Sequence, residues 1–203
     1  MSKTFVVTVG DEEKEFILHT DVAARSSKFF RAAMSNDWKE SRQNRVTLKE
    51  LETVDFELYL QWLSTNEHSF LSDLNLHRLA ELYILGDFLD DFAFRAAMLN
   101  HFVKKTVDGI VYPDHSIVTP TWEQTPEGSP LRKIIVELWV FSPIEILADR
   151  FTGPEKHVPK AFIVEYLRRI GDTQARAKEN LTGNERRRMI ESRRDELLKE
   201  ILA

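Results

Sequence analysis

The 203-residue sequence contains no cysteine, only seven glycines and no long apolar run. Without cysteine the chain can form neither a disulfide framework nor a cysteine-ligated zinc or redox site, which fits a reducing compartment. No stretch approaches the roughly 18 apolar residues that a membrane-spanning helix requires, and the opening residues, MSKT, do not resemble a secretion signal. We therefore expect a nuclear or cytoplasmic protein without a membrane segment.

The sequence also lacks the short motifs that mark common catalytic and cofactor sites. There is no glycine-rich phosphate loop and no G-x-S-x-G nucleophile elbow, so nucleotide binding and serine hydrolysis have no support. The six histidines show no H-E-x-x-H pattern, which argues against a metal site. We expect a protein that is not an enzyme and that carries no catalytic residues, metal or cofactor. The alternative is an enzyme whose site is assembled from scattered polar residues.

The charge and the apolar content narrow the class of protein further. A net charge of −5 argues against nucleic acid as the partner of the whole chain, because nucleic-acid-binding domains are normally basic. Hydrophobic residues make up 42% of the sequence. At this length, that content suffices for one substantial core and an appendage.

The first half of the chain predicts a small sheet followed by helices. Apolar and β-branched alternation marks the strands, and apolar residues spaced by three and four mark the helices. Gly86 and Asp87 are expected to interrupt the second helix, because glycine lowers helix propensity and aspartate starts or caps a turn. Segregated strands and helices indicate an α+β fold. The expected strands are residues 5–9, 15–18 and 45–48, and the expected helices are residues 53–64, a segment starting near residue 76, and residues 91–105.

Between the second and third strands, the sequence predicts two very short helices. His19 lies at the joint between strand and helix. Asp21 can cap the first short helix, and Ser26 or Ser27 can cap the second, because their side-chain oxygens satisfy orphan N–H groups. The apolar anchors of this region are expected to be Phe16, Leu18, Val22, Phe29, Phe30 and Met34.

The pattern Phe16-x-x-His19, followed by Ser27-Lys28-Phe29-Phe30, resembles the F-x-x-H…S-x-x-F core of the BTB/POZ family. Two later segments, YLQWLST from Tyr59 and LYILGDFL from Leu82, resemble a helix end and the l-Y-x-l-A-D-x-l signature of the same family. The resemblance covers roughly residues 5–106. It implies a helical cluster capped by a three-stranded sheet, and a non-catalytic adaptor that binds other proteins.

The second half of the chain predicts a helical extension. Residues 113–130 are rich in proline and threonine and are expected to form a long loop. Helices are expected to start at Pro130, near Ser142 and near Pro159. Ser129-Pro130-Leu131-Arg132 and Trp139-Val140 are similar to an element of the short BTB proteins abundant in filamentous fungi. The expected organisation is a BTB/POZ-like domain over residues 1–108, a loop and helical extension packed on it over residues 109–171, and a charged C-terminal helix over residues 172–203.

The C-terminal stretch opens with a capping box, Thr182 to Glu185, and then combines apolar residues with many arginines. A mixed-charge run of this kind is usually an amphipathic helix with a solvated face. The alternatives are a nuclear-import or nucleic-acid patch formed by the consecutive arginines, or a partner-binding helix. A nucleic-acid patch would make the protein a transcription or chromatin regulator.

The resemblance also implies a partner site. In the BTB/POZ family, cullin-type ubiquitin-ligase scaffolds are engaged partly through an apolar-x-Glu motif after the second short helix, and Trp38, Lys39 and Glu40 match that position and pattern. An exposed tryptophan supplies a large anchor, and a carboxylate adds a charge-assisted hydrogen bond. The resemblance thus implies a substrate adaptor for a cullin-type ligase. The alternative is that Trp38 folds back over the end of the sheet.

The resemblance argues against the swapped dimer of the family. That dimer uses an extra N-terminal strand and helix, an aspartate before the first strand and an arginine after the histidine. This chain has Thr4 near the place of the aspartate and Thr20 after His19, and it starts almost at the first strand. We expect a monomer or a weak homo-oligomer that uses another surface, such as the C-terminal helix. No small-molecule substrate is expected.

Overall fold

The computed structural model describes residues 3–35, 44–65, 69–109, 111–142, 158–176 and 182–202. The chain divides into two compact units. Unit 1 comprises residues 1–70 and 81–95, and unit 2 comprises residues 71–80 and 96–203. Among the described residues, none of the helices combines the length and the apolar character that a membrane crossing demands. The domain boundaries expected after residues 108 and 171 stay predictions.

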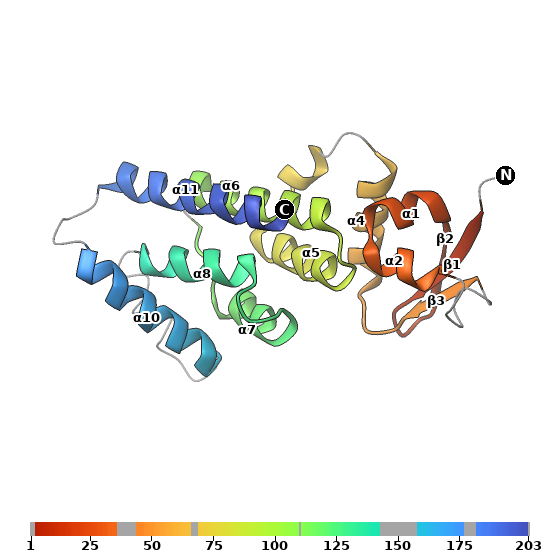
Figure 1. Ribbon diagram of the computed structural model, residues 1–203, viewed down its shortest axis with the longest axis horizontal. Coiled ribbons are helices and arrows are strands. Elements are labelled where there is room, and N and C mark those ends of the chain that lie inside the picture. The colour runs from red at the N-terminus through yellow and green to blue at the C-terminus, as the bar shows by residue number, and fades with distance from the viewer. Residues whose placement is uncertain are drawn as a thin grey trace. The chain divides into compact units, whose positions relative to one another are not determined.

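Unit 1 contains a three-stranded sheet in the order β2-β1-β3 (Figure 1). The central strand, β1, pairs antiparallel with β2 and parallel with β3. Gly10, with a φ of 73°, opens the turn between β1 and β2. This left-handed conformation is one that glycine adopts at no steric cost. The three strands are β1 (Thr4–Val9), β2 (Lys14–His19) and β3 (Arg45–Leu48).

One face of this sheet carries the core of unit 1. Phe5, Val7 and Val9 of β1 are buried on this face, and Leu18 lies opposite Phe5 on β2, while Thr8 is buried on the other face. Ile17, on the other face, is 75% exposed. This alternation follows from the pleat of a strand, which directs successive side chains to opposite faces. The α+β class and the three strands predicted from the sequence are confirmed.

Within the described residues, five α-helices follow or interrupt the sheet. The first two, α1 and α2, are very short and lie beside it (Figure 1). The division between the two units falls within α5 and α6. A short 3-10 helix lies at residues 69–72. The helices are α1 (Thr20–Ser26), α2 (Lys28–Ala33), α4 (Thr53–Ser64), α5 (Leu76–Phe88) and α6 (Phe92–Gly109).

Aromatic side chains form much of the core of unit 1. Phe30 is fully buried, and its ring lies 5.5 Å from that of Phe5 and 6.4 Å from that of Phe56. Phe16, which we expected to be a buried anchor, is only half-buried at the edge of this cluster, 5.2 Å from Phe56. Tyr83 of α5 is also fully buried in the unit.

Two predictions about helix ends in unit 1 are wrong. Asp21 does not cap α1, because the helix already begins at Thr20. His19 occupies the cap position and makes no side-chain cap hydrogen bond. Gly86 does not interrupt α5, which continues to Phe88. A Cβ at Gly86 would lie 2.8 Å from Cδ1 of Phe94, so glycine serves here to let α6 approach α5 closely.

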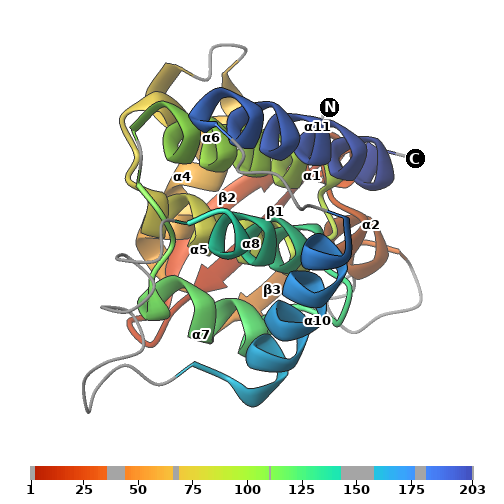
Figure 2. The same cartoon turned by 90° about the vertical axis from the view of Figure 1, so that its left-hand side faces the viewer.

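Unit 2 is helical and is centred on α8. The helix α8 lies between α10 and α11, and α7 packs against it as well (Figure 2). Its Trp139 is fully buried, with its ring 4.8 Å from that of Phe162 of α10. The further helices of this unit are α7 (His115–Gln124), α8 (Pro130–Val140), α10 (Lys160–Arg176) and α11 (Gly183–Leu202).

The long loop expected over residues 113–130 is wrong, because α7 occupies most of it. Asp114 caps this helix by accepting a 3.0 Å hydrogen bond from the backbone N–H of Ser116. The helix contains Pro120 and buries Ile117 and Trp122. An aspartate cap followed by apolar residues on one face was the missed signal, and the proline and threonine content obscured it.

Arg132 and Trp139 have a structural role in unit 2. Arg132 is buried and ends α7, donating a 2.6 Å hydrogen bond to the carbonyl oxygen of Trp122 and a 3.0 Å bond to Oγ1 of Thr125. Trp139 donates from Nε1 to the carbonyl oxygen of Pro113 at 2.9 Å. These bonds satisfy groups that the helix end and the connecting segment would otherwise leave unpaired. The helix start expected near Ser142 lies mostly outside the described residues.

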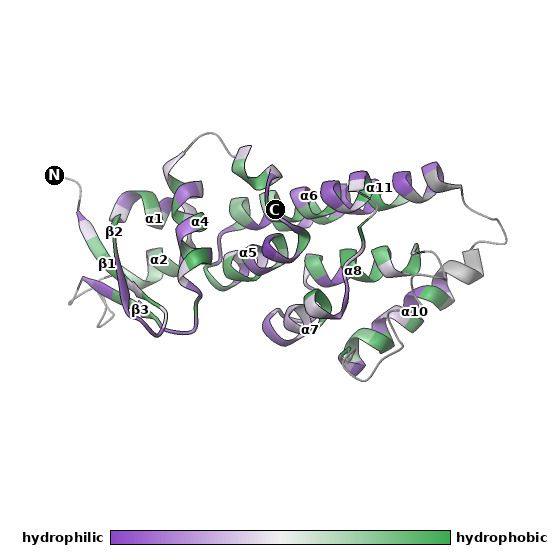
Figure 3. Ribbon diagram, turned by 180° about the vertical axis from the view of Figure 1, so that it is seen from behind, coloured by the Kyte–Doolittle hydropathy of each residue, from purple (hydrophilic) through white to green (hydrophobic). Residues whose placement is uncertain are grey.

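The C-terminal helix α11 packs against α8. Its buried face consists of Ile190, Leu197 and Ile201, and Lys133 of α8 forms a 2.8 Å ion pair with Glu200. Figure 3 shows hydrophilic residues over much of α11 and more hydrophobic ones on α8. The chain end is therefore an amphipathic helix with a solvated face, as the charge pattern predicted.

Candidate interaction surface

The predicted partner site, Trp38, Lys39 and Glu40, lies outside the described residues and stays a prediction. The elements on either side of it are described. The helix α2 ends at Ala33, and the next described segment begins at Asn44, whose carbonyl oxygen accepts a 2.9 Å hydrogen bond from the N–H of Val6. The segment that carries the motif therefore connects a helix and a strand that both belong to unit 1.

The start of α2 is fixed by Ser27, which is fully buried. Its hydroxyl donates to the carbonyl oxygen of Leu89 at 2.6 Å and accepts the N–H of Phe30 at 3.1 Å. The latter bond makes Ser27 the cap of α2, as predicted. The backbone N–H groups of Lys28 and Phe29 also donate to the segment between α5 and α6, at 3.3 Å each. The start of α2 is thus held on the junction of α5 and α6.

The same junction contains the buried carboxylate of Asp91. Its Oδ1 caps α6 by accepting the N–H of Phe94 at 3.0 Å. Its Oδ2 accepts the hydroxyl of Tyr59 at 3.0 Å and also the hydroxyl of Ser26. Burial, followed by the charge of Asp91, raises the pKa of Tyr59, so the phenol remains a donor. Asp91 therefore acts as a structural residue, as its position at a helix start predicted.

An aromatic patch lies on the surface at this junction, and we define it as Phe29, Phe88 and Phe92. Phe88 is 50% exposed, and its ring lies 5.3 Å from that of Phe29. The ammonium group of Lys28 lies 3.9 Å above the ring of Phe92 and 3.7 Å from Oδ2 of Asp90. Exposed aromatic groups are enriched at the centre of protein interfaces, and charged groups are typical of the surrounding rim.

Phe29 and Phe30 were both expected to be apolar anchors, but the structure places them in different surroundings. Neighbouring residues on a helix point about 100° apart, so two consecutive phenylalanines cannot both face the same core. Phe30 is fully buried, whereas Phe29 is only half-buried and contacts Phe88. The pair of adjacent phenylalanines on a short helix was the available signal for a surface aromatic group.

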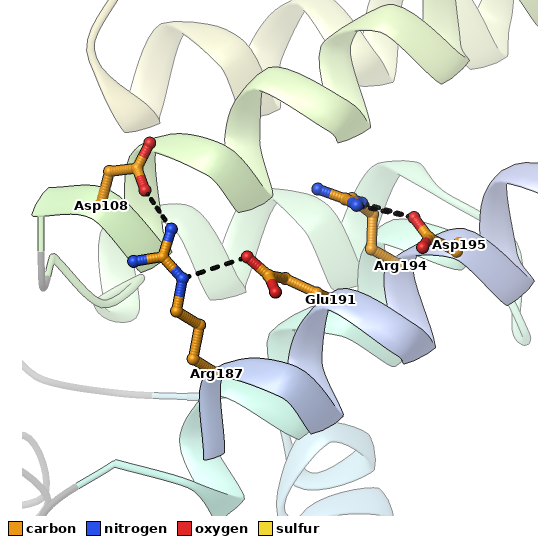
Figure 4. Close-up of polar contacts among 5 residues, drawn as sticks. All are labelled: Asp108, Arg187, Glu191, Arg194 and Asp195. Carbon is orange, nitrogen blue, oxygen red and sulfur yellow. Dashed lines mark hydrogen bonds and ion pairs between the residues drawn. The ribbon is translucent and has the colours of Figure 1, made fainter. Parts of the chain in front are cut away.

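The arginines of α11 do not form a uniformly positive surface. Arg187 donates from Nη2 to Asp108 of α6 at 2.7 Å and from Nε to Glu191 at 3.1 Å (Figure 4). Arg194 lies 2.7 Å from Asp195. Ion pairs of this kind neutralise the positive charge that a nucleic-acid surface requires. The transcription or chromatin regulator considered as the alternative gains no support from this helix.

No metal cluster is present within the described ranges, where no three His, Asp or Glu side chains converge on one point. The described geometry instead consists of a small sheet, a clamped pair of short helices and an exposed aromatic patch, which together define an α+β protein-interaction domain. Residues 3–91 match the family model of the BTB/POZ domain, and they form a BTB/POZ domain. No curated protein matches the chain.

The family assignment confirms the resemblance drawn from Phe16, His19 and the Ser27 segment. A BTB/POZ domain is a protein-interaction module that mediates protein contacts and oligomerisation and is generally not an enzyme. The matched residues end at Asp91, whereas the sequence resemblance extended to about Thr106. Residues 3–91 are therefore a protein-interaction module.

Proposed function

We propose that this protein is a BTB-type adaptor that binds a cullin-type ubiquitin-ligase scaffold through its BTB/POZ domain, in the nucleus or the cytoplasm. The contact would include Trp38, Lys39 and Glu40 and the aromatic patch. The observation that carries this proposal is the exposed ring of Phe88, which contacts the half-buried ring of Phe29 at the junction of α2, α5 and α6.

The chemistry of these residues suits a binding surface. Trp38 and Phe88 would each bury a large apolar area against a partner, and Glu40 would orient the partner by a charge-assisted hydrogen bond. The junction itself is held by backbone bonds and by the buried Ser27 and Asp91 side chains. A rigid anchor of this kind loses little conformational entropy when it binds.

The division of the chain supports an adaptor. Unit 2 has a core of its own, centred on Trp139, Phe162 and Leu138, all fully buried. A chain with an interaction domain and a second compact unit can hold two proteins at once. In this proposal, the BTB/POZ domain contacts the ligase scaffold and unit 2 contacts the substrate. The protein would act as a monomer or a weak homo-oligomer.

Variants of these residues test the proposal by their affinity for a purified cullin N-terminal domain. Trp38→Ala combined with Glu40→Ala should abolish binding, and Phe88→Ala should weaken it by about tenfold or more, as expected for a hot-spot residue. Val54→Ala is the matched control, because Val54 is another apolar side chain of unit 1 and is 52% exposed. It should bind like the parent protein.

Biolayer interferometry with the immobilised full chain measures these affinities, and the melting temperature of each variant reports on folding. The proposal fails if the parent protein does not bind the cullin domain. It also fails if the Trp38 and Glu40 double variant is folded and binds as well as the parent does.

A further inference from the structure

A groove of about 610 Å³ lies on unit 2 and is lined by α8, α10 and α11, the three helices that Figure 2 shows side by side. Val136 of α8 and Met189 of α11 provide apolar lining, and Met189 is 39% exposed. Charged side chains from all three helices surround these residues. A groove with an apolar lining and placed charges has the composition of a site for an amphipathic ligand.

Most of the charged groups around the groove do not favour a ligand of either charge. Arg193 forms a 2.6 Å ion pair with Glu196, and both side chains are partly exposed. Arg168 and Asp172 are exposed on α10. Because water already solvates exposed charges, they gain little from a ligand of either sign.

Glu137 differs from these groups because it is buried. Its Oε1 accepts a 2.7 Å hydrogen bond from Nε of Arg169 on α10. Its Oε2 is buried and has no hydrogen-bond partner among the described residues. A buried carboxylate oxygen without a donor is unfavourable, so a donor that reaches it is bound preferentially.

Arg169 is the more exposed partner of this ion pair. Both residues line the groove, and the Arg169 side chain is 28% exposed whereas that of Glu137 is 7% exposed. Because Oε2 is buried, a donor in the groove reaches it when the Arg169 side chain shifts aside while keeping its bond to Oε1. Two guanidinium groups can then share one carboxylate, because each of its oxygens accepts hydrogen bonds independently.

We propose that this groove binds a segment of a partner protein through an arginine side chain, whose guanidinium donates to Oε2 of Glu137. The aliphatic part of that arginine lies on Val136 and Met189. A guanidinium suits the site better than an ammonium group because it is less strongly hydrated and its planar donors match a carboxylate. The inference concerns unit 2 alone and does not depend on which protein the BTB/POZ domain binds.

A pair of peptides tests this proposal on the isotope-labelled full chain. The first is acetyl-Gly-Gly-Arg-Gly-Gly-amide, and the second carries citrulline, which has the same shape without the charge, in place of arginine. The arginine peptide should cause saturable NMR shifts in the backbone amides of Val136, Met189 and Ser192. The citrulline peptide should bind at least about tenfold more weakly, the effect of losing one hydrogen bond to a charged group.

Variants assign the effect to the carboxylate. Glu137→Gln should remove the preference for arginine over citrulline. Glu191→Gln is the matched control. It disrupts the pair of Glu191 with Arg187, which lies on α11 outside this groove, and this variant should bind the arginine peptide as the parent does. Should Glu137→Gln fail to fold, Met189→Ala decides the question, because loss of its apolar contact should weaken binding about threefold.

Three results would overturn the proposal. The first is the absence of saturable shifts with the arginine peptide. The second is equal affinity of the parent protein for the two peptides. The third is unchanged affinity for the arginine peptide in a folded Glu137→Gln variant or, where that variant does not fold, in Met189→Ala.

Discussion

A single buried carboxylate, that of Asp91, joins three elements of the BTB/POZ domain. It accepts the hydroxyl of Tyr59 from α4, the hydroxyl of Ser26 from α1 and the N–H of Phe94 at the start of α6. Removal of the carboxylate would leave the buried hydroxyl of Tyr59 and the buried N–H of Phe94 without a partner, which is the costly way to lose a hydrogen bond. The buried side chains of Ser27 and Asp91 therefore hold the two short helices and the aromatic patch in place.

At the same scale, Phe30 tests whether the aromatic core stabilises the domain. Phe30 is fully buried between Phe5 and Phe56. We expect Phe30→Ala to lower the free energy of unfolding by about 3 to 5 kcal/mol, because the substitution removes buried apolar area and leaves a cavity. This loss is a large fraction of the roughly 5 to 15 kcal/mol that stabilises a typical domain. Urea denaturation followed by circular dichroism measures it.

Phe88→Ala serves as the control for this experiment, because the Phe88 side chain is half-exposed. Its effect on the free energy of unfolding should be much smaller than that of Phe30→Ala. A Phe30→Ala protein with the same urea midpoint as the parent would contradict the assignment of Phe30 to the core.

At the scale of the element, the helix α11 is defined at its start by a capping box. The hydroxyl oxygen of Thr182 accepts the N–H of Glu185 at 3.3 Å, and Oε2 of Glu185 accepts the N–H of Thr182 at 2.6 Å. These reciprocal bonds satisfy two of the unpaired donors at the helix start. The sequence pattern predicted this box correctly, because its geometry depends only on residues within one turn.

The capping box predicts a lowered pKa for Glu185. Hydrogen bonds from the hydroxyl and then the N–H of Thr182 favour the ionised carboxylate and lower its pKa. The stabilisation of the cap is therefore complete above the ordinary glutamate pKa, and it is lost as the pH falls through the lowered value. Carbon-detected NMR titration of the parent protein and of Thr182→Val measures this pKa. We expect it to rise in the variant, which lacks the hydroxyl.

Glu200 provides the internal control for this titration. Its pKa is lowered by a hydrogen bond from Lys133 and not by Thr182, so it should be the same in both proteins. An identical pKa for Glu185 in the parent and in Thr182→Val would contradict the capping role of the hydroxyl.

The elements that sequence reasoning missed are those whose formation depends on contacts with distant residues. Gly86 has the local propensity of a helix breaker, but its close contact with Phe94 favours a continuous helix. The proline and threonine content of α7 indicated a loop, whereas burial of Trp122 and the cap supplied by Arg132 stabilise a helix. Packing of this kind overrides weak local preferences, and in α7 the only local signal of a helix was the Asp114 cap with the apolar residues that follow it.

At the scale of the whole molecule, the sequence predicted the interaction domain better than its surface. The strands and the motif around His19 and Ser27 are local, so their order identified the BTB/POZ domain. The aromatic patch instead joins Phe29 with Phe88, which lie far apart in the chain. Similarly, the groove of unit 2 combines α8, α10 and α11. No sequence motif marks its buried Glu137, so the burial of this residue could not be predicted.

Hydrogen–deuterium exchange of the full chain, with and without the purified cullin N-terminal domain, tests the central claim most directly. If the BTB/POZ domain binds the scaffold as proposed, exchange should slow in peptides that cover residues 28–43 and 86–94. Peptides of unit 2, including α8 and α11, should exchange at the same rate in both samples. Protection confined to unit 2, or the absence of any protection at saturating cullin domain, would contradict the account.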